Sequence, residues 1–243
     1  KKTQILLWSG DCNPGGAFVK ETYEAGLYNM NFGDTILYYD KNSLTNISPL
    51  GIAKDGYYQV FAPNQNENMY TNDWQGPFYG FERVIETFEL TDKPYRFKPI
   101  DIYYHFYSAT KKSAFKALER VYDWALTQKV MNIYASEYAQ KVLDWRKTLV
   151  ISKNGGWVIR NNGTVKELRI EQSMGYPNLK ESRNVVGYAD INDQRYIHLG
   201  PAIESFIRLQ ATAPQAPYLL EANAAVTKME FIDGEMHLRF KGH

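Results

Sequence analysis

Gln4-Ile5-Leu6-Leu7-Trp8-Ser9-Gly10-Asp11-Cys12-Asn13-Pro14-Gly15-Gly16 is the stretch from which the fold prediction starts. Residues 4–8 are dominated by a continuous apolar run, which is typical of a parallel strand buried on both faces. The Ser, Gly, Asp, Asn and Pro that follow favour a loop. A buried strand that runs straight into a polar loop indicates an α/β architecture.

A helix and a second strand are predicted directly after this loop. A helix is predicted over 17–25, because one side of it carries residues that are suited to packing. Gly26 fits the left-handed position that often ends a helix. Residues 27–32 then form a strand. Short connections of this kind are typical of a parallel strand–helix–strand unit.

A second such unit is predicted after an irregular, aromatic-rich stretch. Residues 35–77 mix Asn, Pro and Gly with aromatic residues, and so long an irregular stretch is more often functional than structural filler. Beyond it we predict a helix over 79–88, a strand over 100–106, a helix over 111–128, a strand over 130–134 and a helix over 138–145. With the first unit, these elements predict an incomplete (β/α) barrel over residues 1–148.

After Thr148 the pattern changes to short strands separated by turn residues. Asp233-Gly234 between two alternating runs is a strong hairpin signal. The predicted strands are 149–151, 157–160, 165–170, 185–188, 194–199, 205–209, 228–232 and 235–240. Strands of this length and spacing predict a β-sandwich over residues 149–243, so the fold class is α/β followed by all-β.

Composition limits the function classes. The net charge of +1 argues against a nucleic-acid binder, because phosphate neutralisation requires a basic excess. No apolar run reaches the roughly 20 residues that span a bilayer, so no transmembrane segment is expected. Aromatic residues make up 15% of the chain; Tyr and Trp stack on sugar rings, although they also populate strands and cores.

Three predicted strand ends carry residues suited to catalysis. These are Asp11, Asp34 and His105, which converge on one rim if the strands are parallel neighbours. A carboxylate beside an imidazole supports a general acid. Asp11 and Asp34 equally fit turns or helix caps, and a lone His is often a hydrogen-bonded core residue. Cys12, the single cysteine, lacks further support as a nucleophile.

Three segments together resemble the polysaccharide deacetylase family. They are Ser-Gly-Asp-Cys-Asn-Pro at 9–14, Leu-Tyr-Asn-Met-Asn-Phe-Gly-Asp at 27–34 and Pro-Ile-Asp-Ile-Tyr-Tyr-His-Phe-Tyr-Ser at 99–108. Their order looks like the later half of a deacetylase barrel, most like the proteins that modify the Pel exopolysaccharide, in which a carbohydrate-binding β-sandwich follows. The resemblance covers residues 4–148 in order, and residues 149–243 in architecture alone.

The resemblance implies a polysaccharide N-deacetylase, with an N-acetylated exopolysaccharide as partner and a periplasmic or extracellular location in a bacterium. His105 would protonate the leaving amine and Asp34 would support it. Asp11 stands where the family usually presents an Arg. We expect substrate contacts from Trp8, Asn13, Tyr39, Trp74 and Tyr107.

The family uses a divalent, zinc-like metal bound by an Asp and two His spaced i, i+4. This chain has no such His pair, so no metal ligands are predicted in it. We therefore expect either a fragment whose first barrel half precedes Lys1, or an inactive relative. As an open-sided fragment it would need a second chain or the missing half to cover its sheet.

Two other functions remain open. One is a non-catalytic carbohydrate-binding or assembly protein that uses Tyr38, Tyr39, Trp74 and Trp157. The other is a glycoside hydrolase whose paired carboxylates are Asp11 and Asp34, about 5–10 Å apart.

Overall fold

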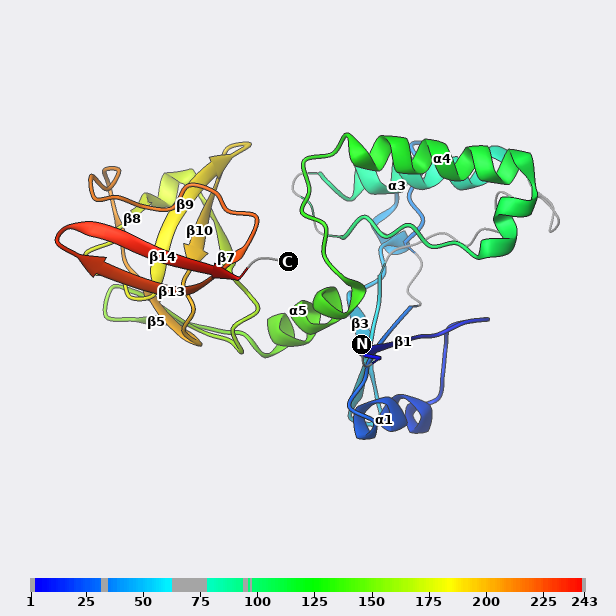
Figure 1. Ribbon diagram of the computed structural model, residues 1–243, viewed down its shortest axis with the longest axis horizontal. Helices are drawn as coiled ribbons and strands as arrows, with labels where there is room; N and C mark the ends of the chain where they lie inside the picture. Colours follow the sequence, from blue (N-terminus) through cyan, green and yellow to red (C-terminus); the bar gives the residue numbers. More distant parts are fainter. Residues whose placement is uncertain (1–2, 32–34, 63–77, 94–95, 97, 242–243) are drawn as a thin grey trace. The chain divides into compact units, whose positions relative to one another are not determined.

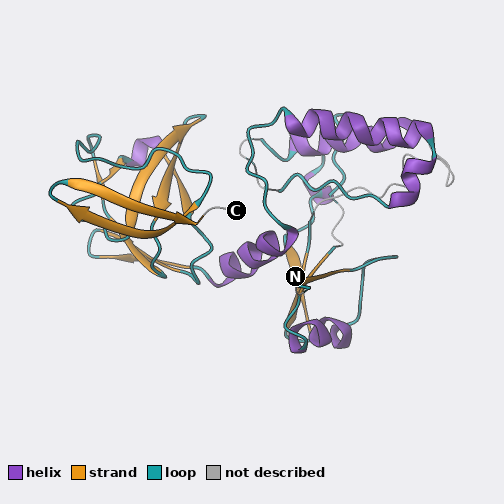
Figure 2. Ribbon diagram, in the orientation of Figure 1, coloured by secondary structure: helices purple, strands orange, loops and turns teal. Residues whose placement is uncertain are grey.

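The computed structural model describes residues 3–31, 35–62, 78–93, 96 and 98–241, apart from the side chains of 78–80 and 107–108. The chain forms two compact units, Lys1–Ala139 and Gln140–His243 (Figure 1). In the described part, most helices belong to the first unit and most strands to the second (Figure 2). The two units divide within helix α5 (Ala135–Lys147), whose end lies beside the boundary predicted after Thr148.

The first unit contains a four-stranded sheet in the order β1-β2-β4-β3. Its strands are β1 (Ile5–Leu7), β2 (Tyr28–Met30), β3 (Gly51–Lys54) and β4 (Tyr57–Val60). The first three in the sheet order are parallel, and β3 is antiparallel to β4. Helix α1 (Gly16–Glu24) connects β1 to β2 and ends just before Gly26, whose φ is +67°. The first predicted strand–helix–strand unit is therefore confirmed.

A helical layer contains an apolar core of this unit. It consists of a 3₁₀ segment η2 (Phe78–Arg83), α3 (Val84–Leu90) and α4 (Lys112–Leu126), with shorter 3₁₀ segments at Leu44–Asn46 and Phe106–Thr110. The predicted helical spacing of 111–128 is confirmed, because α4 buries one stripe against α3 and η2. The buried residues of this cluster are Phe81, Val84, Phe88, Ala114, Ala117, Leu118 and Val121.

The (β/α) barrel expected from the sequence is wrong, because the chain is a mainly-β fold of small sheets. The second parallel unit does not form, since 100–105 and 130–134 are not strands. Ile100, Ile102 and Tyr104 alternate as a strand would, but they pack on the α3–α4 cluster instead of joining the sheet. The sheet instead gains the β3–β4 hairpin, from a stretch that we predicted to be irregular.

The second unit contains most of the chain's antiparallel strands. They are β5 (Leu149–Lys153), β6 (Gly156–Arg160), β7 (Glu167–Glu171), β8 (Tyr176–Pro177), β9 (Val185–Ile191), β10 (Gln194–Leu199), β11 (Glu204–Ile207), β12 (Leu209–Gln210), β13 (Ala225–Ile232) and β14 (Glu235–Lys241). Two three-stranded sheets have the orders β7-β10-β9 and β11-β6-β5, and β12-β8 and β13-β14 are two-stranded. The hairpin predicted at Asp233-Gly234 is confirmed, with φ positive at both turn residues.

The two three-stranded sheets of this unit share one core. Its buried members are Ile159, Val185, Ile197, Leu199 and Ile207, drawn from β6, β9, β10 and β11. Arg195 is also buried, but its charge is satisfied by Asp190 through two hydrogen bonds of 2.8 Å, and its guanidinium lies over the ring of Tyr176. Because this core is close-packed, it fixes the strands from which the side chains of the outer faces project.

Candidate functional site

The carboxyl ends of β1 and β2 lie side by side, as the sequence predicts. Trp8 follows β1, and its indole nitrogen donates to Asn29 Oδ1 at 3.2 Å. Asn31 follows β2, has a positive φ of 96° and donates through Nδ2 to Trp8 O at 2.8 Å. Gln59 of β4 donates to the carbonyls of Asn31 and Cys12. These hydrogen bonds connect the strand ends, and the indole nitrogen of Trp8 already donates its hydrogen bond within the protein.

Asp11 and Asn13 shape the loop after β1. Asp11 Oδ1 accepts a hydrogen bond from the Asn13 backbone N–H at 3.2 Å, which is an Asx turn. Asn13 Oδ1 accepts one from Lys54 Nζ, which also donates to Pro14 O at 2.7 Å. The hydrogen bond of Asp11 therefore fits the turn-forming role that the sequence left open for this residue.

The predicted acid His105 lies beyond the residues that form the sheet. Its Nε2 is 3.3 Å from the Tyr103 hydroxyl, and the two rings meet edge to face. The structure records a contact of His105 with Tyr103, and one of Asp11 with the backbone of Asn13. Asp34 and Trp74 lie outside the described residues, as does the side chain of Tyr107, so their roles stay predictions.

The other aromatic candidates are mostly held by protein contacts. The ring of Tyr38 is buried under the guanidinium of Arg83, 3.7 Å from its centroid. Tyr39 is exposed, but its hydroxyl donates to Glu89, and this bond raises the pKa of Tyr39. Trp157 packs against the core of the second unit.

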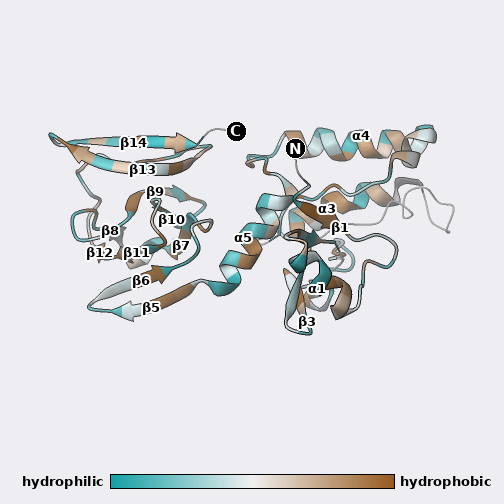
Figure 3. Ribbon diagram, turned by 60° about the horizontal axis from the view of Figure 1, so that its bottom comes forward, coloured by the Kyte–Doolittle hydropathy of each residue, from teal (hydrophilic) through white to brown (hydrophobic). Residues whose placement is uncertain are grey.

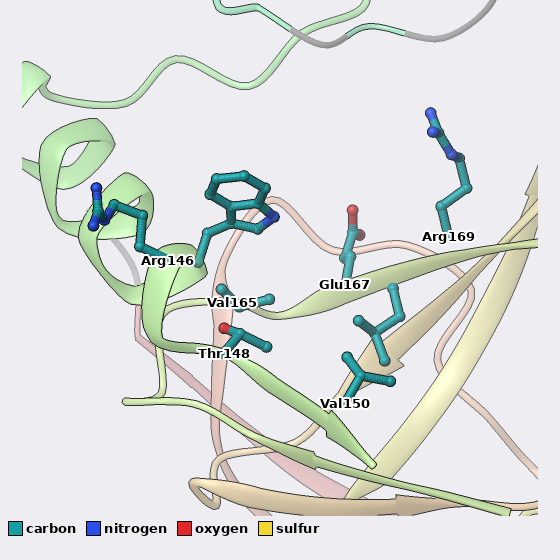
Figure 4. A pocket seen from close by; sticks show the side chains of 8 residues that line it. Arg146, Thr148, Val150, Val165, Glu167 and Arg169 are labelled. Atoms are coloured by element: carbon teal, nitrogen blue, oxygen red, sulfur yellow. The ribbon is translucent and has the colours of Figure 1, made fainter. Parts of the chain in front are cut away.

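A pocket of about 630 Å³ lies in the second unit, between the end of α5 and the outer face of β7. Its lining residues are Trp145, Arg146, Thr148, Val150, Val165, Glu167, Leu168 and Arg169. Glu167 and Arg169 project to the same side of β7, because residues two apart share a face, and Arg146 lies across from them at the helix end (Figure 4). The side chain of Trp145 is 55% exposed.

Asp144 fixes the helix end that carries Trp145. Its carboxylate is buried and accepts hydrogen bonds from the backbone N–H groups of Asn162, Thr164 and Val165, and from the Thr164 hydroxyl. Burial by itself raises the pKa of Asp144, but these donors outweigh it and lower the pKa. One ionised side chain therefore attaches the last turn of α5, which carries Trp145, to the loop that precedes β7.

The carboxylate of Glu167 is paired with the imidazole of His198 of β10. The two residues are direct partners across the β7–β10 pair, with Nδ1 3.1 Å from Oε1, and His198 Nε2 is 2.9 Å from Leu220 O. Burial lowers the pKa of His198, but the hydrogen bonds to Glu167 and Leu220 O outweigh it and raise the pKa. The hydrogen bond from His198 lowers the pKa of Glu167. At neutral pH the pocket thus presents an oriented carboxylate.

The pocket combines an apolar ring face, one fixed acceptor and two guanidinium groups. This arrangement can bind a polar molecule that also has an apolar face. Within the described residues, no group of three or more His, Cys, Asp and Glu side chains is placed to hold a metal ion.

Sequence reasoning missed this pocket, although two signals pointed to it. Trp145 follows Asp144 in the last turn of a polar helix, and such a helix has little apolar face with which to bury a large aromatic side chain. Glu167 and Arg169 alternate with apolar residues along a strand, which places both on its outer face. We predicted both elements, but not their juxtaposition.

Comparisons with protein-family models, with curated proteins and with solved structures find no match to this chain. Across the described residues, none of the helices has the length and apolar character needed to cross a bilayer.

Proposed function

We propose that the second unit binds a saccharide in the pocket beside Trp145, and that the protein is a carbohydrate-binding or assembly protein. The observation that carries this proposal is the half-exposed indole of Trp145 beside the carboxylate of Glu167. The pocket volume lies within the range of about 300–1,000 Å³ that is typical of small-molecule sites.

Sugar rings have the chemistry that these side chains complement. The C–H face of a pyranose is apolar and packs on an indole, while its rim carries hydroxyl groups. An ionised carboxylate only accepts hydrogen bonds, so Glu167 selects ligands that donate O–H groups. The guanidinium groups of Arg146 and Arg169 only donate, so they are suited to hydroxyl, acetamido or carboxylate oxygens.

Because His198 holds Glu167 ionised and oriented, the acceptor is already in place before a ligand arrives. Asp144 anchors the helix turn from which Trp145 projects, through hydrogen bonds to the loop at 162–165. Preorganised groups of this kind lose less entropy on binding than flexible side chains do.

Titration calorimetry with oligosaccharides tests the proposal. The probes are oligomers of N-acetylglucosamine, glucose and glucuronic acid, added to the full chain. We expect saturable binding of at least one probe, and Trp145→Ala should weaken it about tenfold or more, because the stacking face is lost. Trp145→Phe retains an aromatic face and should keep most of the affinity.

Phe231→Ala is the matched control, since Phe231 of β13 is 56% exposed and is not part of the pocket lining. It should leave the affinity unchanged. Absence of binding for every probe, or equal affinity for Trp145→Ala and the wild-type chain, would contradict the proposal.

His105→Ala separates this proposal from the deacetylase function that the resemblance implies. Saccharide binding beside Trp145 should survive this substitution, because His105 belongs to the other unit. A deacetylase would instead lose acetate release from an N-acetylated glycan on His105→Ala. Metal-dependent acetate release by the wild-type chain that is abolished in this variant would favour the enzyme.

A further inference from the structure

The β13–β14 hairpin has two chemically different faces. The cross-strand pairs Met229↔Leu238 and Phe231↔Met236 are apolar. The pairs that alternate with them point to the other face and are polar or mixed: Lys228↔Arg239, Glu230↔His237 and Ile232↔Glu235. The alternation is visible in the hydropathy colours along both strands (Figure 3). Phe231 and Phe240 stay partly exposed at 56% and 42%, so the fold of this chain leaves part of the apolar face uncovered.

The outer edge of β14 carries unused backbone hydrogen-bonding groups. In the two-residue turn at Asp233-Gly234, the N–H of Glu235 points toward β13, and direction alternates along a strand. The backbone groups of Met236, Leu238 and Phe240 therefore point outward. Within the described residues, β14 has no strand neighbour other than β13.

The sequence of β14 is complementary to itself when it is reversed. In an antiparallel pair centred on Leu238, the outward-pointing residues meet: Leu238 faces Leu238 and Met236 faces Phe240 of the other strand. On the opposite face, Glu235 lies opposite Lys241, and Arg239 lies opposite His237, with Glu235 and Arg239 of the other copy as its diagonal neighbours. This register uses all seven residues of the strand.

The edge strands β7 and β5 lack this property. Centred on Arg169, β7 would place Arg169 against itself and Glu167 against Glu171, which is repulsive. Centred on Ile151, β5 would place Leu149 against Lys153. Charge and apolar complementarity thus favour self-pairing of β14 over self-pairing of β7 or β5.

We propose that β14 pairs antiparallel with β14 of a second copy of this chain, in the register centred on Leu238, to form a two-fold symmetric dimer. The product is a continuous four-stranded sheet in the order β13-β14-β14-β13. Its apolar face is contiguous across the two copies, which a self-complementary two-fold contact permits. This interface is independent of the saccharide pocket.

Sedimentation equilibrium of the full chain tests the dimer through charge reversal. Glu235→Lys and Lys241→Glu each turn two symmetric attractive contacts into repulsive ones, so each should weaken dimerisation roughly tenfold. The double variant restores attraction and should return to within about threefold of the wild-type dissociation constant. Both residues are exposed, so folding should be unaffected.

Lys153→Glu, at the end of the edge strand β5, is the matched control and should leave the dimer unchanged. Amide exchange gives a second readout: the N–H groups of Met236, Leu238 and Phe240 should gain protection as concentration rises, whereas those of His237 and Arg239 should be protected throughout. A chain that stays monomeric at about 100 µM, where a specific interface should form, would overturn the proposal. So would a dimer that the double variant fails to restore.

Discussion

Glu167 and His198 form an ion pair at the pocket beside Trp145, and its pH dependence can be tested. Because the pair raises the pKa of His198 above 6.5, its stabilisation is complete below that pH and is lost as pH rises through the folded-state pKa. Glu167→Gln removes the charge at nearly constant size. The variant should titrate His198 at lower pH by NMR.

In the variant, the free energy of unfolding in urea should fall by about 1 kcal/mol near pH 6, a modest value because Glu167 is 59% exposed and therefore screened by solvent. The difference from the wild-type chain should shrink toward pH 9. Glu204→Gln, which breaks the exposed pair between Glu204 of β11 and Arg160 of β6, is the control and should leave the His198 titration unchanged. A His198 titration that is the same in Glu167→Gln and the wild type would contradict this account.

Asp144 carries a larger expected effect, because its carboxylate serves four donors at a buried position. Asp144→Asn would place an N–H₂ group against backbone N–H groups and leave them unsatisfied. We expect a loss of about 3 kcal/mol in the free energy of unfolding, measured in urea at pH 7. Asp193→Asn in the β9–β10 turn should be nearly neutral, since Asn tolerates its positive φ. A small effect of Asp144→Asn would show that the loop does not depend on this carboxylate.

At the scale of elements, Gly187 has no side chain, so the backbone of Leu219 can approach β9 more closely than any other residue type at this position would permit. A Cβ at this position would overlap the carbonyl oxygen of Leu219, whose N–H bonds to Val186 O at 2.8 Å. Gly187→Ala should therefore displace the segment of Leu219 and Leu220, and with it the acceptor of His198 Nε2. We expect about 2 kcal/mol of destabilisation by urea unfolding and a lower pKa of His198.

Gly163→Ala is the comparison for this prediction, because a Cβ there meets no atom within 4 Å, although its positive φ adds some strain. It should leave the His198 titration unchanged. If Gly187→Ala left the same titration unchanged, the proposed link between β9, the Leu219 segment and His198 would be wrong.

Elements with a local signal were predicted from the sequence, and pairings that depend on distant residues were not. The periodicity of α4 and the Asp233-Gly234 turn are local, and both are confirmed. The same turn signal at Asp55-Gly56 was available but was masked by the aromatic residues around it, so the β3–β4 hairpin was missed. Residues 100–105 show the opposite error, because alternation cannot tell a strand from an extended segment that packs on helices.

The candidate site was harder to predict than the fold, for a physical reason. Trp145 and Glu167 come from different elements, and a single sequence contains no signal of their proximity. The hydrogen bonds of Asp144 and Lys141 to the loop at 162–165 connect the helix that carries Trp145 to the strand that carries Glu167. Of the strand-end residues favoured by the sequence, Asp11 does follow β1 at the carboxyl edge of the sheet, but its hydrogen bond to the Asn13 N–H shapes the loop.

For the whole molecule, the division into two units has a thermodynamic consequence. Each unit has its own apolar core, and the core around Phe88 shares no residue with the core around Ile197. Domains with separate cores commonly unfold as separate cooperative units. We therefore expect two transitions in a calorimetric scan of the full chain.

Two core substitutions assign these transitions. Phe88 and Ile197 are both fully buried, so Phe88→Ala and Ile197→Ala should each remove about 3 kcal/mol or more from the unit that contains them. Phe88→Ala should lower the midpoint of one transition, and Ile197→Ala that of the other. Saccharide binding should raise only the transition that Ile197→Ala lowers, because ligands stabilise the unit to which they bind. A single transition shifted by both substitutions would mean that the chain unfolds as one cooperative structure.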